Sequence, residues 1–227
     1  MFRKEEYALV LDFLPHGKAL EGKQEPVAQV LGESFFTLLE VALKPNISVN
    51  IFDRVYIGKD VRDKVERIRS RLTYKDLTNV GQQEVEKTVR KILTSHEQEY
   101  VGFLNRAGSI NIRIHSLELL PGVGKKNLES FISEREKTPF VSFEDINNRM
   151  PHLQQVEEII LHRIIQELKA EEKYYLFVKI PPKEEGEGEG EQRRFGSDRR
   201  YSSERRFSDR GGSNYGDRNR NSYGNKY

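Results

Sequence analysis

The stretch LELLPGVGKKNLESFI, residues 117–132, carries the most specific local pattern in the chain. Apolar residues lead into the sequence Pro-Gly-Val-Gly at 121–124, and two lysines follow it. Glycine adopts backbone conformations that other residues avoid, and it lets another molecule approach the main chain closely. The pattern predicts a tight turn between two short helices, the first over residues 112–119 and the second from Lys125 to about Glu134.

This turn is a candidate phosphate-binding site. The first turn of a helix leaves main-chain N–H groups without partners inside the helix, and the helix dipole is positive at that end. Such a site can hold a phosphate, and a phosphate contact positions a nucleic acid without reading its sequence. The alternative is a connector used for protein contacts, which the net charge of −3 over residues 107–172 favours. The residues expected to make the phosphate contact are Gly122, Val123, Gly124, Lys125 and Lys126.

Upstream of the turn, residues 1–79 predict a small OB-like β-barrel. Short apolar and aromatic runs recur there at roughly ten-residue spacing and are separated by polar or glycine-containing turns, as in small barrels and sandwiches. The first four runs lie at residues 7–11, 26–31, 34–43 and 50–57.

A fifth run, VERIRSRLTY at 65–74, predicts a strand whose arginines share one face. Its residues alternate strictly, and the period of two places arginines opposite Ile68 and Leu72. Residues 59–75 carry a net charge of +4, which suits single-stranded nucleic acid, with an aromatic side chain as stacking platform. The alternative is an ordinary solvated strand face. The expected barrel contacts are Arg62, Lys64, Arg67, Arg69, Arg71 and Tyr74.

Helical periodicity extends over residues 80–172. The hairpin at 112–135 is followed by a second, degenerate hairpin at 142–168, whose turn lacks glycine and is expected only to pack. The run YYLFVKI at 174–180 returns to β character. We expect this strand, within residues 173–181, to complete the barrel, so that the helical domain is an insertion in a discontinuous domain.

The end of the chain predicts disorder. An acidic Gly/Glu linker at 182–191 precedes an Arg/Gly/aromatic tail at 192–227, which has no aliphatic side chain to form a core. The net charge is zero over residues 1–182, −4 over 183–191 and +6 over 192–227. Arginine beside Phe or Tyr favours phosphate pairing and base stacking, and the alternative is a solubilising tail. The expected tail contacts are Arg193, Arg194, Phe195, Arg199, Arg200, Tyr201, Arg205, Arg206, Phe207 and Arg210.

Composition argues against several classes of protein. The 227 residues include no cysteine, which excludes disulfides, cysteinyl zinc sites and thiol catalysis. No apolar run approaches the roughly 18–20 residues that span a bilayer, and the N-terminus does not read as a signal peptide, so we expect a cytoplasmic protein. No P-loop, GxSxG or HExxH pattern occurs, and the five histidines do not fall at metal-ligand spacing. We therefore expect no enzyme activity, no metal and no other cofactor.

Residues 1–180 resemble an archaeal family of uncharacterised, predicted RNA-binding proteins that join an OB-like barrel to a helix-hairpin-helix module. The turn at 120–124 is similar to a helix-hairpin-helix turn, and the stretch at 139–145 with the helix after it is similar to a second copy. The resemblance implies an α+β fold. It rests on the Arg-rich strand 62–74 with Asp76-Leu77-Thr78 after it, the run His115–Gly122, the stretch Ser142–Asp145 and the run Lys173–Phe177.

The function expected from these features is non-catalytic nucleic-acid binding, with RNA preferred to DNA. Ribosomal RNA, the ribosome or the transcription machinery are the expected partners, and no membrane or small-molecule substrate is expected. Two alternatives remain: a protein–protein adaptor in a translation or transcription assembly, and a DNA-binding accessory in repair or recombination.

Overall fold

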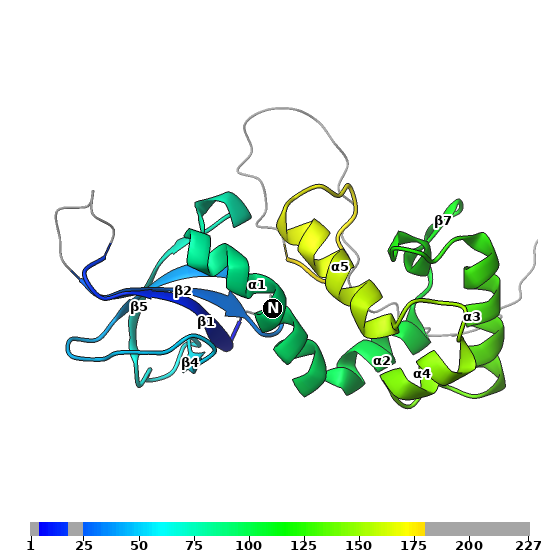
Figure 1. The fold of residues 1–227 in the computed structure, drawn as a ribbon, viewed down its shortest axis with the longest axis horizontal. Helices are drawn as coiled ribbons and strands as arrows, with labels where there is room; N and C mark the ends of the chain where they lie inside the picture. The colour runs from blue at the N-terminus through cyan, green and yellow to red at the C-terminus, as the bar shows by residue number, and fades with distance from the viewer. Residues whose placement is uncertain (1–4, 18–24, 180–227) are drawn as a thin grey trace, which may run out of the picture. The chain divides into compact units, whose positions relative to one another are not determined.

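The computed structural model describes residues 5–17 and 25–179, which form a curled antiparallel sheet followed by helices (Figure 1). The protein therefore has the mixed α and β fold that the sequence predicts. The expected acidic linker at 182–191 and the tail at 192–227, with its candidate contacts from Arg193 to Arg210, lie outside the described residues.

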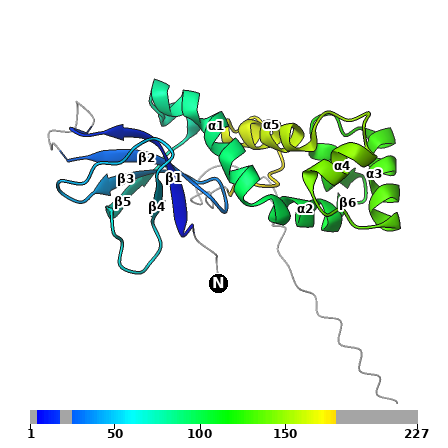
Figure 2. The same ribbon diagram turned by 60° about the horizontal axis from the view of Figure 1, so that its bottom comes forward.

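Five strands make one antiparallel sheet in the order β4-β1-β2-β3-β5 (Figure 2). Three consecutive strands pair as neighbours, and β4 returns by a long connection to lie beside β1, which is the order of a Greek key. Among the described strands β4 and β5 do not pair with each other, so the sheet is a half-barrel that stays open between them. The strands are β1 (Tyr7–Leu14), β2 (Val27–Gly32), β3 (Leu38–Leu43), β4 (Arg54–Tyr56) and β5 (Val65–Arg71).

Both faces of the sheet are buried, and each has its own core. Along β1, Ala8 and Val10 belong to one core, whereas Leu9 and Leu11 belong to the other, as the alternation of side chains in a strand requires. The first core includes Val55 of β4 and Val65 of β5, so it lies inside the curl. Burial on both faces explains why these strands read as nearly continuous apolar runs.

Two expected strands are shorter in the structure because the backbone turns at their ends. The run 34–43 becomes extended only from Leu38, since Phe36 has a φ of +50°. The run 50–57 forms β4 over three residues, and Phe52 before it has a φ of +69°. Positive φ angles interrupt a strand, and aromatic residues rarely adopt them, so neither turn is visible in the sequence.

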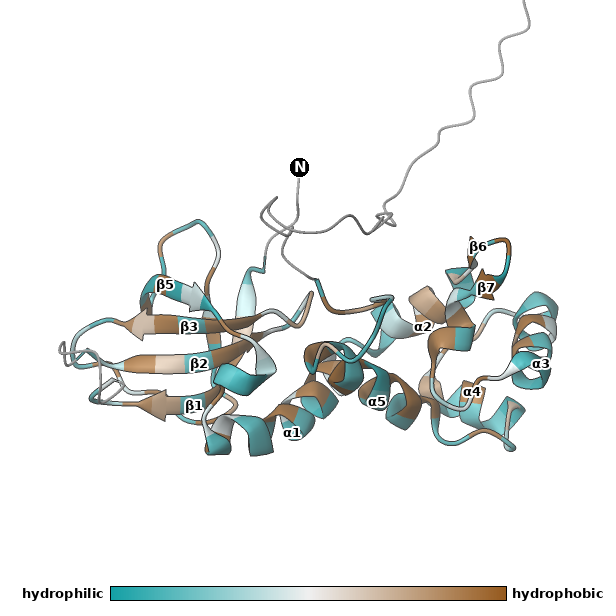
Figure 3. Cartoon of the chain, turned by 90° about the horizontal axis from the view of Figure 1, so that it is seen from above, coloured by the Kyte–Doolittle hydropathy of each residue, from teal (hydrophilic) through white to brown (hydrophobic). Residues whose placement is uncertain are grey.

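The helix α1 (Asn79–Ser95) covers the outer face of the sheet (Figure 3). Thr78 caps it, since its hydroxyl oxygen accepts a hydrogen bond from the N–H of Gly81 at 3.0 Å. Its apolar stripe packs into a core that continues from the sheet through every other α-helix. The other helices are α2 (Glu97–Arg106), α3 (Lys125–Lys137), α4 (Phe143–Arg149) and α5 (Val156–Leu168), with a one-turn 3-10 helix η1 (Tyr74–Asp76) between β5 and α1.

The helix expected over residues 112–119 is wrong. The structure has a β-hairpin there, β6 (Ser109–Asn111) and β7 (Ile114–His115), followed by a short 3-10 helix η2 (Ser116–Leu119). The side-chain oxygen of Asn111 accepts from the N–H groups of Arg113 and Ile114 at 2.8 and 3.0 Å, which closes the hairpin tip. Asparagine offers the chain this local alternative to a helix.

The returning strand expected at 174–180 is also wrong for its described part, which ends at Lys179. Residues 174–179 contain no strand, and Leu176, Phe177 and Val178 pack instead against the helical core. Their three N–H groups all donate to the carboxylate of Glu167 on α5. The Glu167 side chain therefore accepts from the N–H groups that would otherwise pair with a neighbouring strand, and residues 176–178 are held against α5.

Candidate functional site

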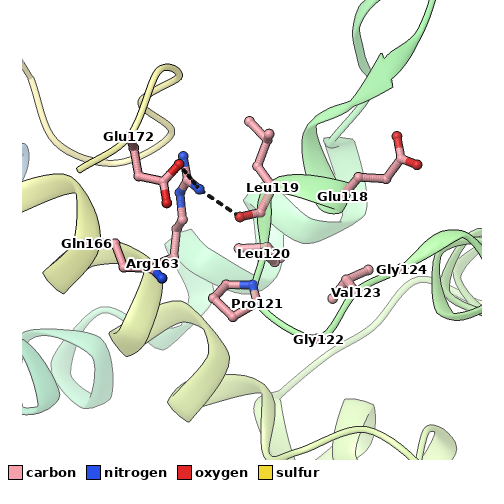
Figure 4. Close-up of a pocket in the computed structure, with 10 residues that line it drawn as sticks. All are labelled: Glu118, Leu119, Leu120, Pro121, Gly122, Val123, Gly124, Arg163, Gln166 and Glu172. Atoms are coloured by element: carbon pink, nitrogen blue, oxygen red, sulfur yellow. Dashed lines mark hydrogen bonds and ion pairs between the residues drawn. The ribbon is translucent and has the colours of Figure 1, made fainter. Parts of the chain in front are cut away.

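The Pro-Gly-Val-Gly turn links η2 to α3 with its main chain facing open space (Figure 4). Gly122 has a φ of +80°, a conformation that favours glycine. Gly124 has a φ of −78° and a ψ of 176°, an extended conformation that any residue adopts. A Cβ atom added at either glycine would meet nothing within 4 Å. The backbone conformation therefore favours a glycine at position 122 but does not require one at position 124.

The N-terminus of α3 has main-chain donors without a capping side chain. Gly124 is the N-cap residue and has no side chain to offer, and the first helical hydrogen bond runs from the N–H of Leu128 to the carbonyl of Gly124 at 2.9 Å. The N–H groups before Leu128 thus find no side-chain cap in the described part of the chain. Lys125 and Lys126 are exposed beside them, while Val123 is buried and anchors the turn.

A buried arginine on α5 fixes the turn from behind (Figure 4). Arg163 donates through Nη1 to the carbonyl of Leu119 at 2.9 Å and through Nη2 to the carbonyl of Tyr174. Its Nε lies 2.8 Å from the carboxylate of Glu167, and its Nη1 lies 3.0 Å from that of Glu172. The turn, α5 and the segment after it are joined through this one side chain.

A pocket of about 350 Å³ lies between the turn and α5. Its two acidic side chains already have partners: Glu172 pairs with Arg163, and Glu118 accepts from the N–H of His115 at 2.8 Å. The N–H group of His115 does not neutralise the charge of Glu118, and Arg163 shares its charge between Glu172 and Glu167. The positive groups near the turn are the N-terminus of α3 and the exposed Lys125 and Lys126, which lie outside the pocket lining. The pocket is lined by Glu118, Leu119, Leu120, Pro121, Gly122, Val123, Gly124, Arg163, Gln166 and Glu172.

The short helix η2 before the turn is capped by a histidine. The Nδ1 atom of His115 accepts from the N–H of Leu117 at 3.2 Å, while the hydroxyl and N–H of Ser116 donate to the carbonyl of Gly108 at 2.7 and 2.9 Å. Burial, together with the charge of Arg135, lowers the pKa of His115 and favours the neutral ring that this cap requires. The sequence pattern does not predict a capping role for His115, and the spacing of His115 and Glu118 is the signal that could have indicated it.

Two of the three arginines of β5 are held by acidic partners. Arg67 donates to Glu25 at 2.7 and 2.9 Å, and Arg69 lies 3.4 Å from Glu25 and 3.2 Å from Glu40. Arg71 donates to the carbonyl of Lys179. The expected row of arginines exists, but two of its charges are compensated by carboxylates that are distant in the sequence.

The other residues expected on the barrel face do not join this row. Arg62 donates to the carbonyl of Gly58 at 2.9 Å, and Lys64 lies 3.5 Å from Asp53. Tyr74 lies beyond the strand, in η1, and packs against the helical core. The centroid of its ring lies 5.6 Å from the ammonium of Lys169.

Residues 5–17 and 25–179 contain neither a metal-binding cluster nor a membrane-spanning helix. No group of three or more His, Asp or Glu side chains there is placed to hold a metal ion. None of the helices in those ranges combines the length and apolar character that crossing a membrane needs.

The chain is similar to proteins whose function is not known. The model of a family described as protein of unknown function (DUF655) matches residues 4–179. An uncharacterized protein, MJ0038 of Methanocaldococcus jannaschii, is 41% identical over 177 residues, which cover 77% of this chain and 80% of that protein. The crystal structure of Af1531 from Archaeoglobus fulgidus, of the same family, has a TM-score of 0.71 and 47% identity, and covers 77% of this chain and 100% of that one.

Proposed function

The chain belongs to the DUF655 family of proteins of unknown function, and we propose that it is a non-catalytic protein that binds nucleic acid, RNA in preference to DNA. The observation that carries the proposal is the presence of a glycine at position 124, where the fold does not require one. Its backbone conformation needs no glycine and its missing side chain leaves empty space, yet it lies at an uncapped helix N-terminus followed by two exposed lysines. A phosphate that approaches the main chain there explains all three features.

The proposal includes the finer identification of the two modules. We infer that η2, the turn and α3 act as a helix-hairpin-helix motif, and that the half-barrel acts as an OB-like domain. The motif supports contacts to the sugar-phosphate backbone, which position a strand without reading its bases. The Greek-key strand order and the arginines of β5 support the second identification.

Affinity in this proposal comes from several weak contacts together. An exposed anion gains only about 0.3–1 kcal/mol at a helix N-terminus, so the turn alone holds a strand weakly. The tail carries a net charge of +6 and Arg-aromatic repeats, and a tethered second contact raises the effective concentration of the first. The preference for RNA rests on these repeats, which suit unpaired bases, and on the family resemblance.

A protein–protein adaptor is the second candidate. It is favoured by the ion pairs of Arg67 and Arg69 with Glu25 and Glu40, because charges already compensated by carboxylates attract a polyanion weakly. The neutral net charge of residues 1–182 also favours it. Nuclease treatment of a lysate pull-down separates the two candidates, since captured partners should survive it only in the adaptor.

The direct test is fluorescence anisotropy of the full chain with a short single-stranded RNA and with duplex DNA, over a range of salt concentrations. Gly124→Glu places a carboxylate where the phosphate should lie, so we expect weaker binding and a salt slope smaller by about 0.7 on single strands. Val141→Glu is the matched control, because it adds the same carboxylate at a position that is 66% exposed and lies outside the turn and the hairpin. Equal affinity of the two variants and the wild type would refute a phosphate contact at the turn.

A further inference from the structure

The hairpin β6–β7 ends in an apolar side chain that the described protein leaves uncovered. Ile112 at its tip has a relative exposure of 105%, and Arg113 beside it is also exposed. The guanidinium of Arg113 makes no ion pair with the described residues. A single exposed isoleucine is common on protein surfaces, so exposure by itself assigns no role to it. What distinguishes Ile112 is the hydrogen-bonded hairpin tip that carries it.

The tip is held in one conformation by hydrogen bonds from both of its ends. The side chain of Asn111 accepts from the N–H groups of Arg113 and Ile114, so the loop donors are satisfied locally. At the base, Ser116 donates twice to the carbonyl of Gly108. An apolar side chain on a fixed support loses little conformational freedom when it binds, and this favours a contact role.

The hairpin and the glycine turn form one structural piece. β7 continues directly into η2, and the capping bonds between His115 and Glu118 tie the two together. The last residue of η2, Leu119, is held by Arg163 of α5 (Figure 4). Ile112 precedes Gly124 by twelve residues, so the hairpin tip and the turn are parts of one continuous piece of the chain.

We propose that Ile112 stacks against an unpaired base of the RNA whose phosphate lies at Gly124, while Arg113 pairs with a neighbouring phosphate. Aliphatic side chains such as Ile and Leu are known to act as wedges between bases, and unpaired RNA bases are free to stack on a side chain. The cation next to Ile112 fits a polyanion and not an apolar protein surface. This inference rests on the function proposed above.

The first experiment compares Ile112→Ala with Gly124→Glu in the full chain, by anisotropy with a short single-stranded RNA across salt concentrations. Loss of a stacked contact should weaken binding about fivefold or more without changing the salt slope, because an apolar contact releases no counterions. Gly124→Glu should reduce the slope instead. Circular dichroism should show unchanged unfolding for Ile112→Ala, since its side chain packs on nothing.

The second experiment uses the absence of tryptophan from the chain. Ile112→Trp gives a single tryptophan at the tip, which can be excited apart from the tyrosines, and Val141→Trp gives a matched control at a position that is 66% exposed, on the connection between α3 and α4. We expect RNA to shift and quench the emission of the first variant and to shield it from acrylamide, with no change in the second. A shift that depends on protein concentration alone would overturn the inference and indicate contact between two copies of the chain.

The outcomes separate this inference from the one on which it rests. Suppose that the wild type binds RNA and that Gly124→Glu weakens binding, but that Ile112→Ala keeps the wild-type affinity and the emission of Ile112→Trp does not change with RNA. The stacking role is then wrong and the proposed function stands. If the wild type binds no RNA at all, both are wrong.

Discussion

Replacement of Glu167 by glutamine should destabilise the whole folded region, because this carboxylate joins α5 to residues 176–178 and pairs with Arg163, which holds the turn. Its two oxygens accept from Nε of Arg163 at 2.8 Å and from the N–H groups of Leu176, Phe177 and Val178 at 2.7, 2.9 and 2.9 Å. Both members of the ion pair are buried, with side-chain exposures of 3% for Arg163 and 0% for Glu167. Glutamine keeps the size of the side chain but removes its charge and turns one acceptor into a donor.

The expected loss of stability follows from the positive charge that remains buried on Arg163. Removal of one partner of a buried ion pair leaves the other uncompensated, which destabilises a protein by about 3–5 kcal/mol. For a folded region of this size each kcal/mol lowers the melting temperature by about 2–4 °C, so Glu167→Gln should lower it by roughly 10 °C. Glu172 still faces Arg163 at 3.0 Å, which places the expected cost at the lower end.

Thermal unfolding followed by circular dichroism, with urea unfolding at 25 °C, measures this cost. The informative comparison is the double variant Arg163→Met, Glu167→Gln, which removes both charges and keeps a side-chain oxygen that can accept from the main-chain N–H groups. Because no buried charge is then left without its partner, part of the lost stability should return. A loss below about 1 kcal/mol for Glu167→Gln would refute the assignment of Arg163 and Glu167 as the link between the turn and the segment 172–178.

Two further predictions concern the turn and its cap. Gly122→Ala should destabilise the protein by about 1 kcal/mol, because a Cβ atom is strained at a φ of +80°. Gly108→Ala is the control and should cause no such loss, because Gly108 has no positive φ and its Cβ would meet nothing within 4 Å. Equal melting temperatures for the two variants would contradict this prediction. The second prediction follows from the lowered pKa of His115: folding favours the neutral ring, so its stabilising contribution is present above the unfolded pKa of 6.5 and is lost as the pH falls below it. His115→Asn, whose side chain keeps an acceptor but does not titrate, should therefore lose less stability than the wild type between pH 7 and pH 5, and parallel pH curves of melting temperature would disprove this role.

Local patterns predicted the elements whose form is decided locally. The apolar run of β1 reflects a strand that is buried on both faces, and the apolar stripe of α1 reflects a helix that is buried on one, so both patterns are visible in the residues themselves. The start of α3 was predicted at Lys125 and lies there, because a glycine-rich turn followed by helix formers leaves little choice. The five-stranded antiparallel sheet followed by helices follows from the same patterns.

The errors have a common physical origin in contacts between distant residues. An apolar run such as 174–180 is compatible with a strand in a sheet or with packing on a helical core. Glu167 accepts hydrogen bonds from the N–H groups of this run and so favours the second arrangement, and the sequence pattern identifies Glu167 only as part of a helix. Isoleucines occupy positions 110, 112 and 114, a spacing that also fits a strand, and the hydrogen bonds of Asn111 favour a hairpin there. In both cases a single polar side chain satisfied main-chain groups in a way that hydrophobic periodicity does not record.

The same reasoning changes the relative weight of the two candidate contact surfaces. The arginines of β5 dominate the sequence because three lie in five residues, but their charge is shared with Glu25 and Glu40, whose proximity arises only when the sheet forms. The turn at Gly124 has fewer charges and lies in a region with a net charge of −3, yet the acidic groups in its pocket are bonded to protein atoms and its main-chain donors are not capped. Because a ligand gains most from groups that have no internal partner, phosphate should be held first at the turn and only second at the strand.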